Sequence, residues 1–303
     1  MRYFVLLPTL FVLVACQSAD DGQAESAAAD VADSSATVEA PTNTLAAVLA
    51  AQPEEAQARY QYRHPQETIE FFGIEPGMTV LEGLPGGGWY TKVLLPYLGT
   101  SGEVIGGSYA IDMWARFPFA SEEFMARQET WVADWPAMAA EWGGDNPGAI
   151  SAFHFGSLPA ELEGTADLAF FPRVLHNLAR FENQGVGDYL SVALADTYKV
   201  LKPGGILGVV QHHARDDMPD DWADGSNGYL KKSFVIAKAE AAGFELVGDS
   251  DINANPNDQP TTDDIVWRLP PTYGTSGDDA EKRAAMDAIG ESNRMTLKFR
   301  KPE

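Results

Sequence analysis

Residues 79–98, TVLEGLPGGGWYTKVLLPYL, decide the fold because they predict a strand, a glycine turn and a helix in immediate succession. The β-branched and apolar run at 79–82 is typical of a buried strand. The three glycines at 86–88 permit a tight turn, and the apolar spacing from residue 89 to 98 is typical of a helix that packs on a sheet. Such a turn lets a ligand approach the backbone closely, and the amides that open the helix favour a carboxylate or a phosphate.

The same alternation continues along the rest of the chain. We expect further strands at residues 104–105, 150–155, 166–171, 206–210, 244–247 and 294–299, and helices at 45–62, 65–72, 186–201 and 233–242. A Pro-Gly-Gly turn at 203–205 is expected to lead into the strand at 206–210. Strands joined by helices form right-handed crossovers, so the pattern predicts an α/β fold with a doubly wound, mostly parallel sheet covered on both faces. Ligands of such a sheet bind at the carboxyl ends of its strands.

The glycine turn carries a resemblance to a known class of enzymes. The segment from Glu82 to Gly88 resembles the first motif of class I S-adenosylmethionine-dependent methyltransferases, an acid followed by alternating glycines. Leu84 stands where the first of those glycines is found. The resemblance implies a Rossmann-like sheet with an antiparallel closing strand and S-adenosylmethionine as the cofactor. It implies that the cofactor contacts Glu82, Leu84, Gly86, Gly87 and Gly88.

Two alternatives to this interpretation follow from the same residues. As a dinucleotide fingerprint, residues 86–91 lack the last glycine of G-x-G-x-x-G, which disfavours a nicotinamide cofactor. A tight turn with no ligand is the structural alternative. For Glu82 the alternative role is capping, or pairing with Arg63 or His64.

Longer segments resemble a family of bacterial exported proteins described as predicted methyltransferases. They are FFGIEPGMTVLEGLPGGGWYTKVLLPYL (71–98), LKPGGILGVVQHHA (201–214), FVIAKAEAAGFELVGDSDINANP (234–256) and AIGESNRMTLKFRKP (288–302). The resemblance runs from about Arg63 to Pro302. Two positions depart from the methyltransferase pattern: Ser108 and Ser157 stand where acids contact the ribose hydroxyls and the adenine amine. Weaker or different cofactor binding is therefore expected at these two positions, which remain cofactor-site candidates, and Asp112 is the acid nearest to Ser108.

Two histidines are candidates for a general base. His176 and His212 follow the fourth and fifth expected strands, at the edge of the sheet where the acceptor substrate binds in this fold. Histidine suits this role because its unperturbed charge change lies nearest to neutral pH. The alternative for each is a purely structural role.

Polar residues near these histidines and after the sixth expected strand are candidates for the acceptor pocket. The candidates are Arg173, Asn177, Gln211, Asn253 and Asn255. A plain turn at 253–256 is the structural alternative. A metal site is not expected, because adjacent residues of a strand such as His212 and His213 point to opposite faces.

The N-terminus predicts export and a lipid anchor. Residues 1–15 carry one charge, Arg2, followed by an apolar run too short to span a bilayer, which is typical of a signal peptide. Leu13 to Cys16 resembles the bacterial lipobox, which implies lipidation of Cys16 and attachment to a membrane. Gln17 stands where Asp would favour inner-membrane retention, so we expect the outer membrane, facing the periplasm. Residues 16–43, with six acids and no aromatic side chain, are expected to be a disordered tether to a domain at 44–303.

Composition excludes several classes of function. The 303 residues include 21 Lys and Arg against 44 Asp and Glu, which gives a formal charge of −23. Such acidity disfavours nucleic acid as a partner, because phosphodiester binding needs clustered basic residues. The single cysteine forms no internal disulfide.

Two functions therefore remain on sequence grounds. The first is methyl transfer from S-adenosylmethionine to a small-molecule acceptor in the cell envelope. The second is a non-catalytic envelope lipoprotein that keeps the methyltransferase fold and binds an adenosine-like or other small ligand. The glycine turn favours the enzyme, whereas the two absent acids and an exported location favour the binding protein.

Overall fold

The computed structural model describes residues 44–144 and 147–303. The expected signal peptide (1–15), the lipidation site at Cys16 and the acidic tether (16–43) lie outside the described residues.

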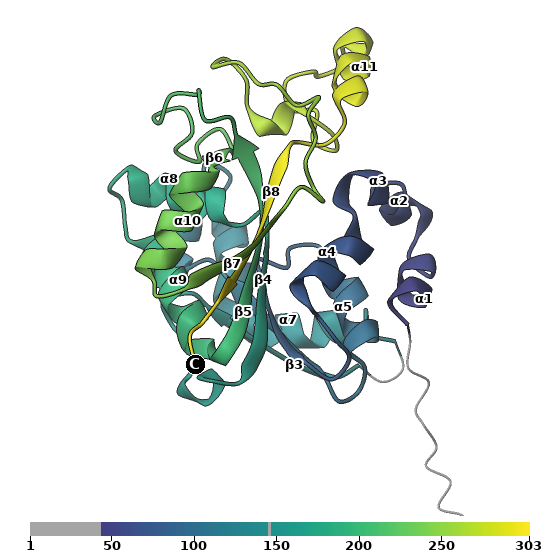
Figure 1. Ribbon diagram of the computed structural model, residues 1–303, viewed down its shortest axis with the longest axis vertical. Coiled ribbons are helices and arrows are strands. Elements are labelled where there is room, and N and C mark those ends of the chain that lie inside the picture. Colours follow the sequence, from purple (N-terminus) through teal and green to yellow (C-terminus); the bar gives the residue numbers. More distant parts are fainter. Residues whose placement is uncertain (1–43, 145–146) are drawn as a thin grey trace, which may run out of the picture. The chain divides into compact units, whose positions relative to one another are not determined.

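One sheet, in which the spatial order of the strands differs from their order in the sequence, forms the centre of the expected domain at 44–303 (Figure 1). Its strands are β1 (Thr79–Gly83), β2 (Glu103–Ser108), β3 (Ala149–His154), β4 (Ala166–Pro172), β5 (Leu201–Ala214), β7 (Glu245–Ser250) and β8 (Arg294–Arg300), and the two-residue β6 (Leu230–Lys231) pairs with β5 alone. The order is β3-β2-β1-β4-β5-β8-β7. Strands β1 to β5 pair in parallel, and β8 runs antiparallel to both of its neighbours. The expected doubly wound sheet with an antiparallel closing strand is confirmed.

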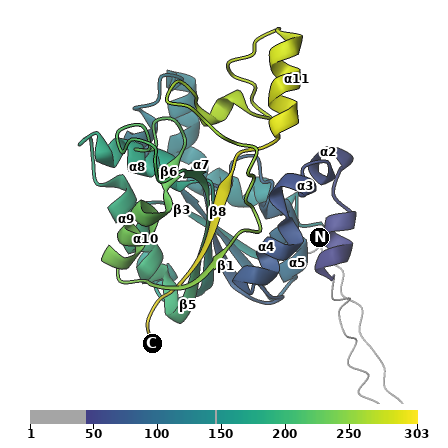
Figure 2. The same ribbon diagram turned by 45° about the horizontal axis from the view of Figure 1, so that its top comes forward.

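Helices cover both faces of the sheet, as Figures 1 and 2 show. One face packs against α1 (Leu45–Ala50), α4 (Pro65–Phe72), α5 (Thr91–Leu98) and α7 (Glu122–Ala140), and the other against α6 (Ile111–Trp114), α8 (Leu175–Asn183), α9 (Tyr189–Val200) and α10 (Lys232–Ala241). The remaining helices are α2 (Glu54–Gln57), α3 (Tyr60–Arg63), α11 (Ala280–Ile289) and the 3-10 turns η1 (Ala160–Leu162) and η2 (Val266–Arg268).

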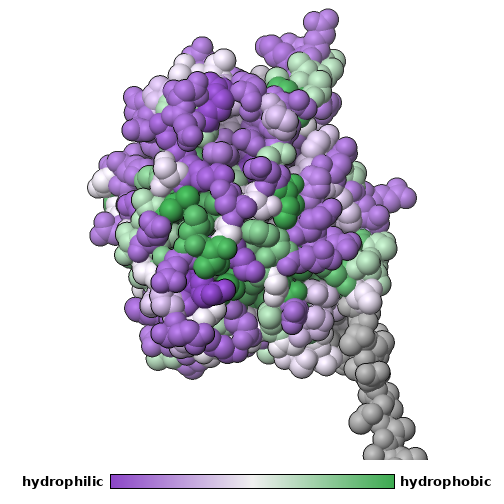
Figure 3. Space-filling view, viewed as in Figure 1, coloured by the Kyte–Doolittle hydropathy of each residue, from purple (hydrophilic) through white to green (hydrophobic). Residues whose placement is uncertain are grey.

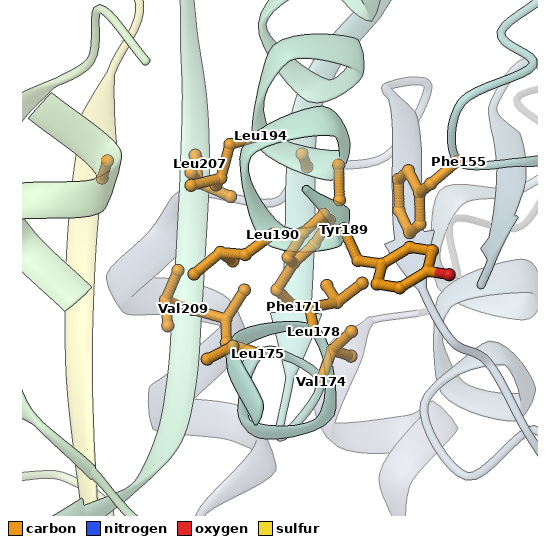
Figure 4. Close-up of a cluster of buried hydrophobic side chains, with 14 of the residues drawn as sticks. Phe155, Phe171, Val174, Leu175, Leu178, Tyr189, Leu190, Leu194, Leu207 and Val209 are labelled. Carbon is orange, nitrogen blue, oxygen red and sulfur yellow. The ribbon is translucent and has the colours of Figure 1, made fainter. Parts of the chain in front are cut away.

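The alternation of side chains along each strand divides the core between the two faces. Val80 and Leu81 are both fully buried, yet they belong to different clusters because successive strand residues point to opposite faces. Figure 4 shows the cluster under α8 and α9, where Leu190 and Leu194 meet Phe171 of β4 and Val209 of β5. Burial on both faces explains why these strands read as continuous apolar runs in the sequence.

The parallel register brings four strand ends to one edge of the sheet. Glu82 of β1 lies opposite Gly106 of β2 and Phe170 of β4, and Phe171 lies opposite Val209 of β5. The segments that follow β1, β2, β4 and β5 therefore meet at the same edge. This is the edge at which sheets of this kind bind ligands.

Two expectations of secondary structure were wrong in detail, and one long helix was not expected. The helix expected at 45–62 is divided into α1, α2 and α3, because Pro53 has no amide hydrogen to continue a helix. The turn expected at 203–205 is a bulge inside β5, whose pairing with β4 skips from Leu201 to Ile206. Helix α7, which covers β3, has no counterpart among the expected elements.

The surface seen in Figure 3 is mostly hydrophilic, with apolar side chains gathered near the middle of the view. Among the exposed apolar side chains are Leu246 and Val247 of the edge strand β7. Within residues 44–144 and 147–303, no helix combines the length and the apolar character needed to cross a membrane.

Candidate ligand-binding site

Glu82, near the end of β1, anchors the glycine turn that follows this strand. This carboxylate is almost completely buried, and its Oε2 accepts a hydrogen bond of 2.7 Å from the Thr91 hydroxyl at the start of α5. Burial raises the pKa of Glu82 to about 7, against the smaller opposing effect of the Thr91 hydrogen bond. The contact ties the end of the strand to the start of the helix, so the turn between them is held in place. Glu82 itself lines none of the cavities described below.

The backbone of this turn adopts conformations that favour glycine. Leu84 has φ +50°, Gly86 has φ +56° and Gly88 has φ +76°. Leu84 is thus a non-glycine residue in a left-handed conformation, at the position where the resembling motif has glycine. A Cβ on Gly88 would lie 2.2 Å from the Trp142 ring, whereas Gly87 has open space around it. Packing therefore requires glycine at 88, and Gly87 faces open space.

The turn forms one wall of the largest cleft at this edge, which has a volume of about 680 Å³. Leu84, Pro85, Gly86 and Gly87 line it from the turn, Pro172 and Arg173 from the end of β4, and His212 from β5. The opposite wall comes from the segment of α1 to α3, including Gln52, Glu55, Arg59 and Arg63. The amides of Gly86 and Gly87 donate no hydrogen bond within the described residues. They are therefore free to bind a ligand.

A second cavity of about 500 Å³ lies at the ends of β2 and β3. Its walls combine apolar side chains such as Ile111, Phe155 and Leu178 with the polar groups of Asp112 and Ser157. The Asp112 carboxylate accepts a hydrogen bond of 2.7 Å from the Tyr189 hydroxyl. Asp112 and the predicted site residue Ser157 thus line one cavity.

Tyr109 separates the two cavities. It follows directly after β2, and its hydroxyl donates a hydrogen bond of 3.1 Å to the carbonyl of Val174, just after β4. Because β1 lies between β2 and β4, the side chain crosses over the end of β1. The ring is 1% exposed and packs against Trp114 and Phe117. The passage between the cavities is therefore closed in this conformation.

Ser108, predicted to stand in the ribose position, faces neither cavity. It is buried, and its hydroxyl accepts a hydrogen bond of 3.1 Å from the Trp114 indole. The polar group that the structure places in the second cavity is that of Asp112, four residues further along.

The two candidate bases lie side by side. The rings of His176 and His212 are 5.4 Å apart between centroids. His212 Nδ1 lies 2.6 Å from the Ser292 hydroxyl, and its ring lines the cleft. His176 is buried, and its Nδ1 has no hydrogen-bond partner within the described residues.

Both histidines are uncharged at neutral pH. Burial lowers the pKa of His176 to about 4. Burial, followed by unfavourable electrostatic coupling to His176 and by the positive charges of Arg294 and Arg173, holds the pKa of His212 well below its usual value. A neutral imidazole is the form that accepts a proton. Of the two, His212 is the one that reaches the cleft.

The acceptor-pocket candidates separate into two groups. Arg173 lines the cleft, and Asn177 donates to the Tyr109 hydroxyl at 3.4 Å. Gln211 and Asn253 are buried: the amide of Gln211 donates to the Gly228 carbonyl and that of Asn253 to two threonine hydroxyls. Asn255 donates to the carbonyls of Ile289 and Glu291. The amides of these last three side chains bond to groups of the protein itself, and none of the three lines the cleft.

A group of buried charges beside the cleft was not among the sequence candidates. Glu291 accepts hydrogen bonds from Arg59 Nε at 2.6 Å and from Arg63 Nε at 3.3 Å, and it also pairs with Arg294. Burial alone would raise the pKa of Glu291, but the three guanidinium groups lower it to about 2. Arg59 and Arg63 lie more than 200 residues from Glu291 in the sequence, which hides their pairing with it from any search of local motifs. Within the described residues, no cluster of three potential metal ligands occurs.

Comparison with known proteins gives similarity at the level of the fold. No protein-family model matches the sequence, and no curated protein does. Similar solved structures include a SAM-dependent methyltransferase from Aquifex aeolicus, with 16% identity, TM-score 0.47 and coverage of 82% of this chain and 98% of that one. An arsenic(III) S-adenosylmethionine methyltransferase from Chlamydomonas reinhardtii has 19% identity, TM-score 0.45 and coverage of 87% and 75%. A geranyl diphosphate methyltransferase in complex with SAM has 15% identity, TM-score 0.47 and coverage of 85% and 90%.

Proposed function

We propose that this protein is an S-adenosylmethionine-dependent methyltransferase that acts on a small-molecule acceptor in the bacterial cell envelope. The observation that carries the proposal is the glycine turn after β1: Gly86 and Gly87 line a cleft of about 680 Å³ at the carboxyl edge of the sheet, and their amides donate no hydrogen bond within the described residues. This is where a doubly wound sheet binds its ligand. The resemblance of the turn to the first methyltransferase motif supplies the identity of the cofactor.

The residues present fit the two ends of the cofactor. The Gly86 and Gly87 amides, with Leu84 beside them, suit the amino-acid end, because free amides bind carboxylates. The second cavity suits the adenosine end: its apolar walls accommodate a base, and Asp112 and Ser157 offer partners for hydroxyl and amine groups. When bound, the cofactor supplies a sulfonium methyl group for in-line transfer.

Tyr109 must move for one ligand to occupy both cavities. Its hydrogen bond to the Val174 carbonyl spans the route between them. We therefore infer that the protein opens at Tyr109 when it binds the cofactor. Only a fraction of the molecules is open at any moment, and the apparent affinity falls by that fraction.

The chain itself contributes positioning and a proton acceptor. The turn and the two cavities hold donor and acceptor in one orientation, which is the main source of catalysis in such a transfer. His212, neutral and at the cleft, accepts the proton that an oxygen or nitrogen acceptor loses on methylation. His176 lies behind it and supports its ring.

The test is calorimetric titration of the purified protein with S-adenosylmethionine and S-adenosylhomocysteine, with NAD beside them. We expect the first two to bind and NAD not to bind. Gly86→Val adds a side chain at a left-handed position on the wall of the cleft and should abolish binding. Gly164→Val is the matched control, because Gly164 has φ +68°, open space around it and no place in either cavity. Equal binding by all three proteins would rule out the turn as the cofactor site.

A second candidate function is a binding protein without catalysis. Two observations favour it. The hydrogen bond of Tyr109 to the Val174 carbonyl closes the passage between the two cavities, and the Ser108 hydroxyl is buried and bonded to the Trp114 indole. The two functions differ in methyl transfer from labelled S-adenosylmethionine to periplasmic extracts. Binding of the cofactor without labelling of any extract component would favour the binding protein.

A further inference from the structure

The cleft carries an excess of positive charge that the chain does not neutralise. Among the residues that the structure describes, Glu291 is the only carboxylate that pairs with Arg59, Arg63 and Arg294. Arg173 lies close enough to this group for the charges of Arg63 and Arg294 to act on it. Four guanidinium groups therefore share one carboxylate.

Arg173 is the member of this group without a partner. Within residues 44–144 and 147–303, its guanidinium makes no hydrogen bond and no ion pair. Desolvation and the positive charges of Arg63 and Arg294 hold the pKa of Arg173 well below its ordinary value. Half-buried cations are normally paired, because desolvation without a partner is costly. An unpaired guanidinium beside two others indicates a place for an anion.

The backbone holds Arg173 in a specific position. Its φ of +65° is left-handed, which is uncommon for a residue with a side chain. Its amide donates a hydrogen bond of 2.6 Å to the carbonyl of Val210 in β5. Strained conformations of this kind are concentrated at functional sites, where the surrounding structure enforces them.

Arg173 and Arg63 face two adjoining spaces. Both line the cleft beside the glycine turn, and both line a smaller cavity of about 170 Å³ between the end of β5 and the segment 266–272. His212 is the third residue common to the two. An anion held by these arginines is thus placed beside the candidate base, on the side away from the second cavity at β2 and β3.

The charge of the cleft contrasts with that of the chain. The protein has a formal charge of −23, so small anions are repelled from most of its surface. At the cleft, Lys92 adds to the arginines, and Glu55 is an exposed acid on the rim. Because the rest of the protein is acidic, this positive region attracts anions to the cleft and not to the remaining surface.

We propose that the methyl acceptor is a small molecule with a carboxylate or phosphate group, which Arg173 and Arg63 bind. This inference rests on the proposed methyltransferase function and assigns the class of its substrate. The planar guanidinium group matches both anions, because it donates two parallel hydrogen bonds to their oxygens. The amino-acid end of the cofactor is a second source of a carboxylate, so the experiment must separate the two.

The experiment measures anion and cofactor binding separately, by calorimetry at constant ionic strength. Inorganic phosphate and succinate are the anion probes, and S-adenosylmethionine is titrated in parallel. The variants are Arg173→Gln, Arg173→Lys and, as a control for net charge, Arg127→Gln. Arg127 pairs with Glu123 on the exposed face of α7, so its loss changes charge without touching the cleft. Arg173→Gln should fold normally, because the side chain has no partner to lose.

We expect Arg173→Gln to weaken binding of phosphate or succinate by about 10- to 100-fold, the usual effect of losing a charged hydrogen-bond partner. Arg173→Lys should keep part of the affinity, and Arg127→Gln all of it. The cofactor affinity of Arg173→Gln should stay within about twofold of the wild type. A parallel fall in cofactor affinity would assign the arginines to the cofactor and overturn the acceptor assignment. Wild-type protein that binds neither anion would overturn the anion site itself.

Failure of the proposed function gives a different result. A protein that binds phosphate through Arg173 but never binds S-adenosylmethionine has the anion site without the methyltransferase. The acceptor assignment would then be wrong, although the arginines bind their anion.

Discussion

At the scale of single residues, the site depends on polar and charged side chains that are buried. Glu82 lies at the end of a buried strand with one hydrogen-bond partner, Thr91. Arg173 has no hydrogen-bond or ion-pair partner within residues 44–144 and 147–303, and His212 is buried near Arg173 and Arg294. Proteins retain such groups where function requires them, because a packed apolar residue would be more stable in each position.

Glu82 yields a prediction about stability and pH. Its folded-state pKa of about 7 lies above the ordinary 4.5 of the unfolded chain, so the folded protein binds the extra proton between these values. Its contribution to stability is complete below pH 4.5 and is lost as the pH rises to about 7. Glu82→Gln keeps an acceptor for Thr91 but carries no charge. At pH 8 we expect it to exceed the wild type in stability by an amount on the order of 3 kcal/mol, from about 1.4 kcal/mol per pKa unit.

The measurement is urea-induced unfolding between pH 5 and pH 8. The wild type should lose stability relative to Glu82→Gln across this interval, and Glu75→Gln, at an exposed turn, should follow the wild type. Parallel pH profiles for Glu82→Gln and the wild type would show that the carboxylate is ionised without cost.

At the scale of elements, the decisive contact is the crossing of Tyr109 from β2 to the end of β4. Its hydroxyl donates a hydrogen bond of 3.1 Å to the Val174 carbonyl and accepts one of 3.4 Å from Asn177, and its ring packs against Trp114 and Phe117. Such a bond contributes a net 0.5–1.5 kcal/mol, roughly, to the state that contains it. The equilibrium between the closed and the open state is therefore sensitive to the hydroxyl oxygen of Tyr109.

Removal of that oxygen should favour the open state. We expect Tyr109→Phe to bind S-adenosylmethionine about 2- to 10-fold more tightly than the wild type, because the closed state loses its hydrogen bond. Tyr97→Phe is the matched control: it loses a similar bond of 3.2 Å to the Ile74 carbonyl, away from both cavities. Calorimetric titration compares the three proteins. An unchanged or weaker affinity for Tyr109→Phe would mean that this side chain does not limit access.

Local sequence patterns predicted most of the elements that build the edge of the sheet. The β-branched run at 79–82 and the glycines at 86–88 gave β1, its turn and α5 almost to the residue. Short-range chemistry dictates these features, because a buried strand needs apolar side chains and a tight turn needs glycine. The resemblance then gave the antiparallel β8, which no local pattern distinguishes from a parallel strand.

The site itself was only partly predictable. Gly86, Gly87, Arg173 and His212 do line the cleft. The ion group around Glu291 could not be found, because Arg59 and Arg63 reach Glu291 only through tertiary contacts. The burial of Asn253 could not be predicted for the same reason. Its amide donates hydrogen bonds to the hydroxyls of Thr68 and Thr296, which are distant in the sequence. Chemistry that depends on long-range contacts leaves no local signal.

At the scale of the whole molecule, charge and position limit the reactions that the protein can perform. We propose that a chain with a charge of −23 and a local cluster of arginines binds small anions in preference to nucleic acids. An envelope location, which we propose from residues 1–16, raises the question of cofactor supply, since S-adenosylmethionine is made in the cytoplasm. Establishing that location is therefore a condition for interpreting any activity.

The location depends on Cys16, the only cysteine of the chain. If lipid chains are attached there, they anchor the protein to a membrane. We expect the wild type to fractionate with the outer membrane and Cys16→Ser to be soluble or to persist as an uncleaved precursor. Ser18→Ala is the control, because it changes a neighbouring hydroxyl and leaves the cysteine intact. Gln17→Asp should keep the lipid but move the protein to the inner membrane. Fractionation and intact mass are measured for each protein, and equal mass and distribution for the wild type and Cys16→Ser would refute the anchor.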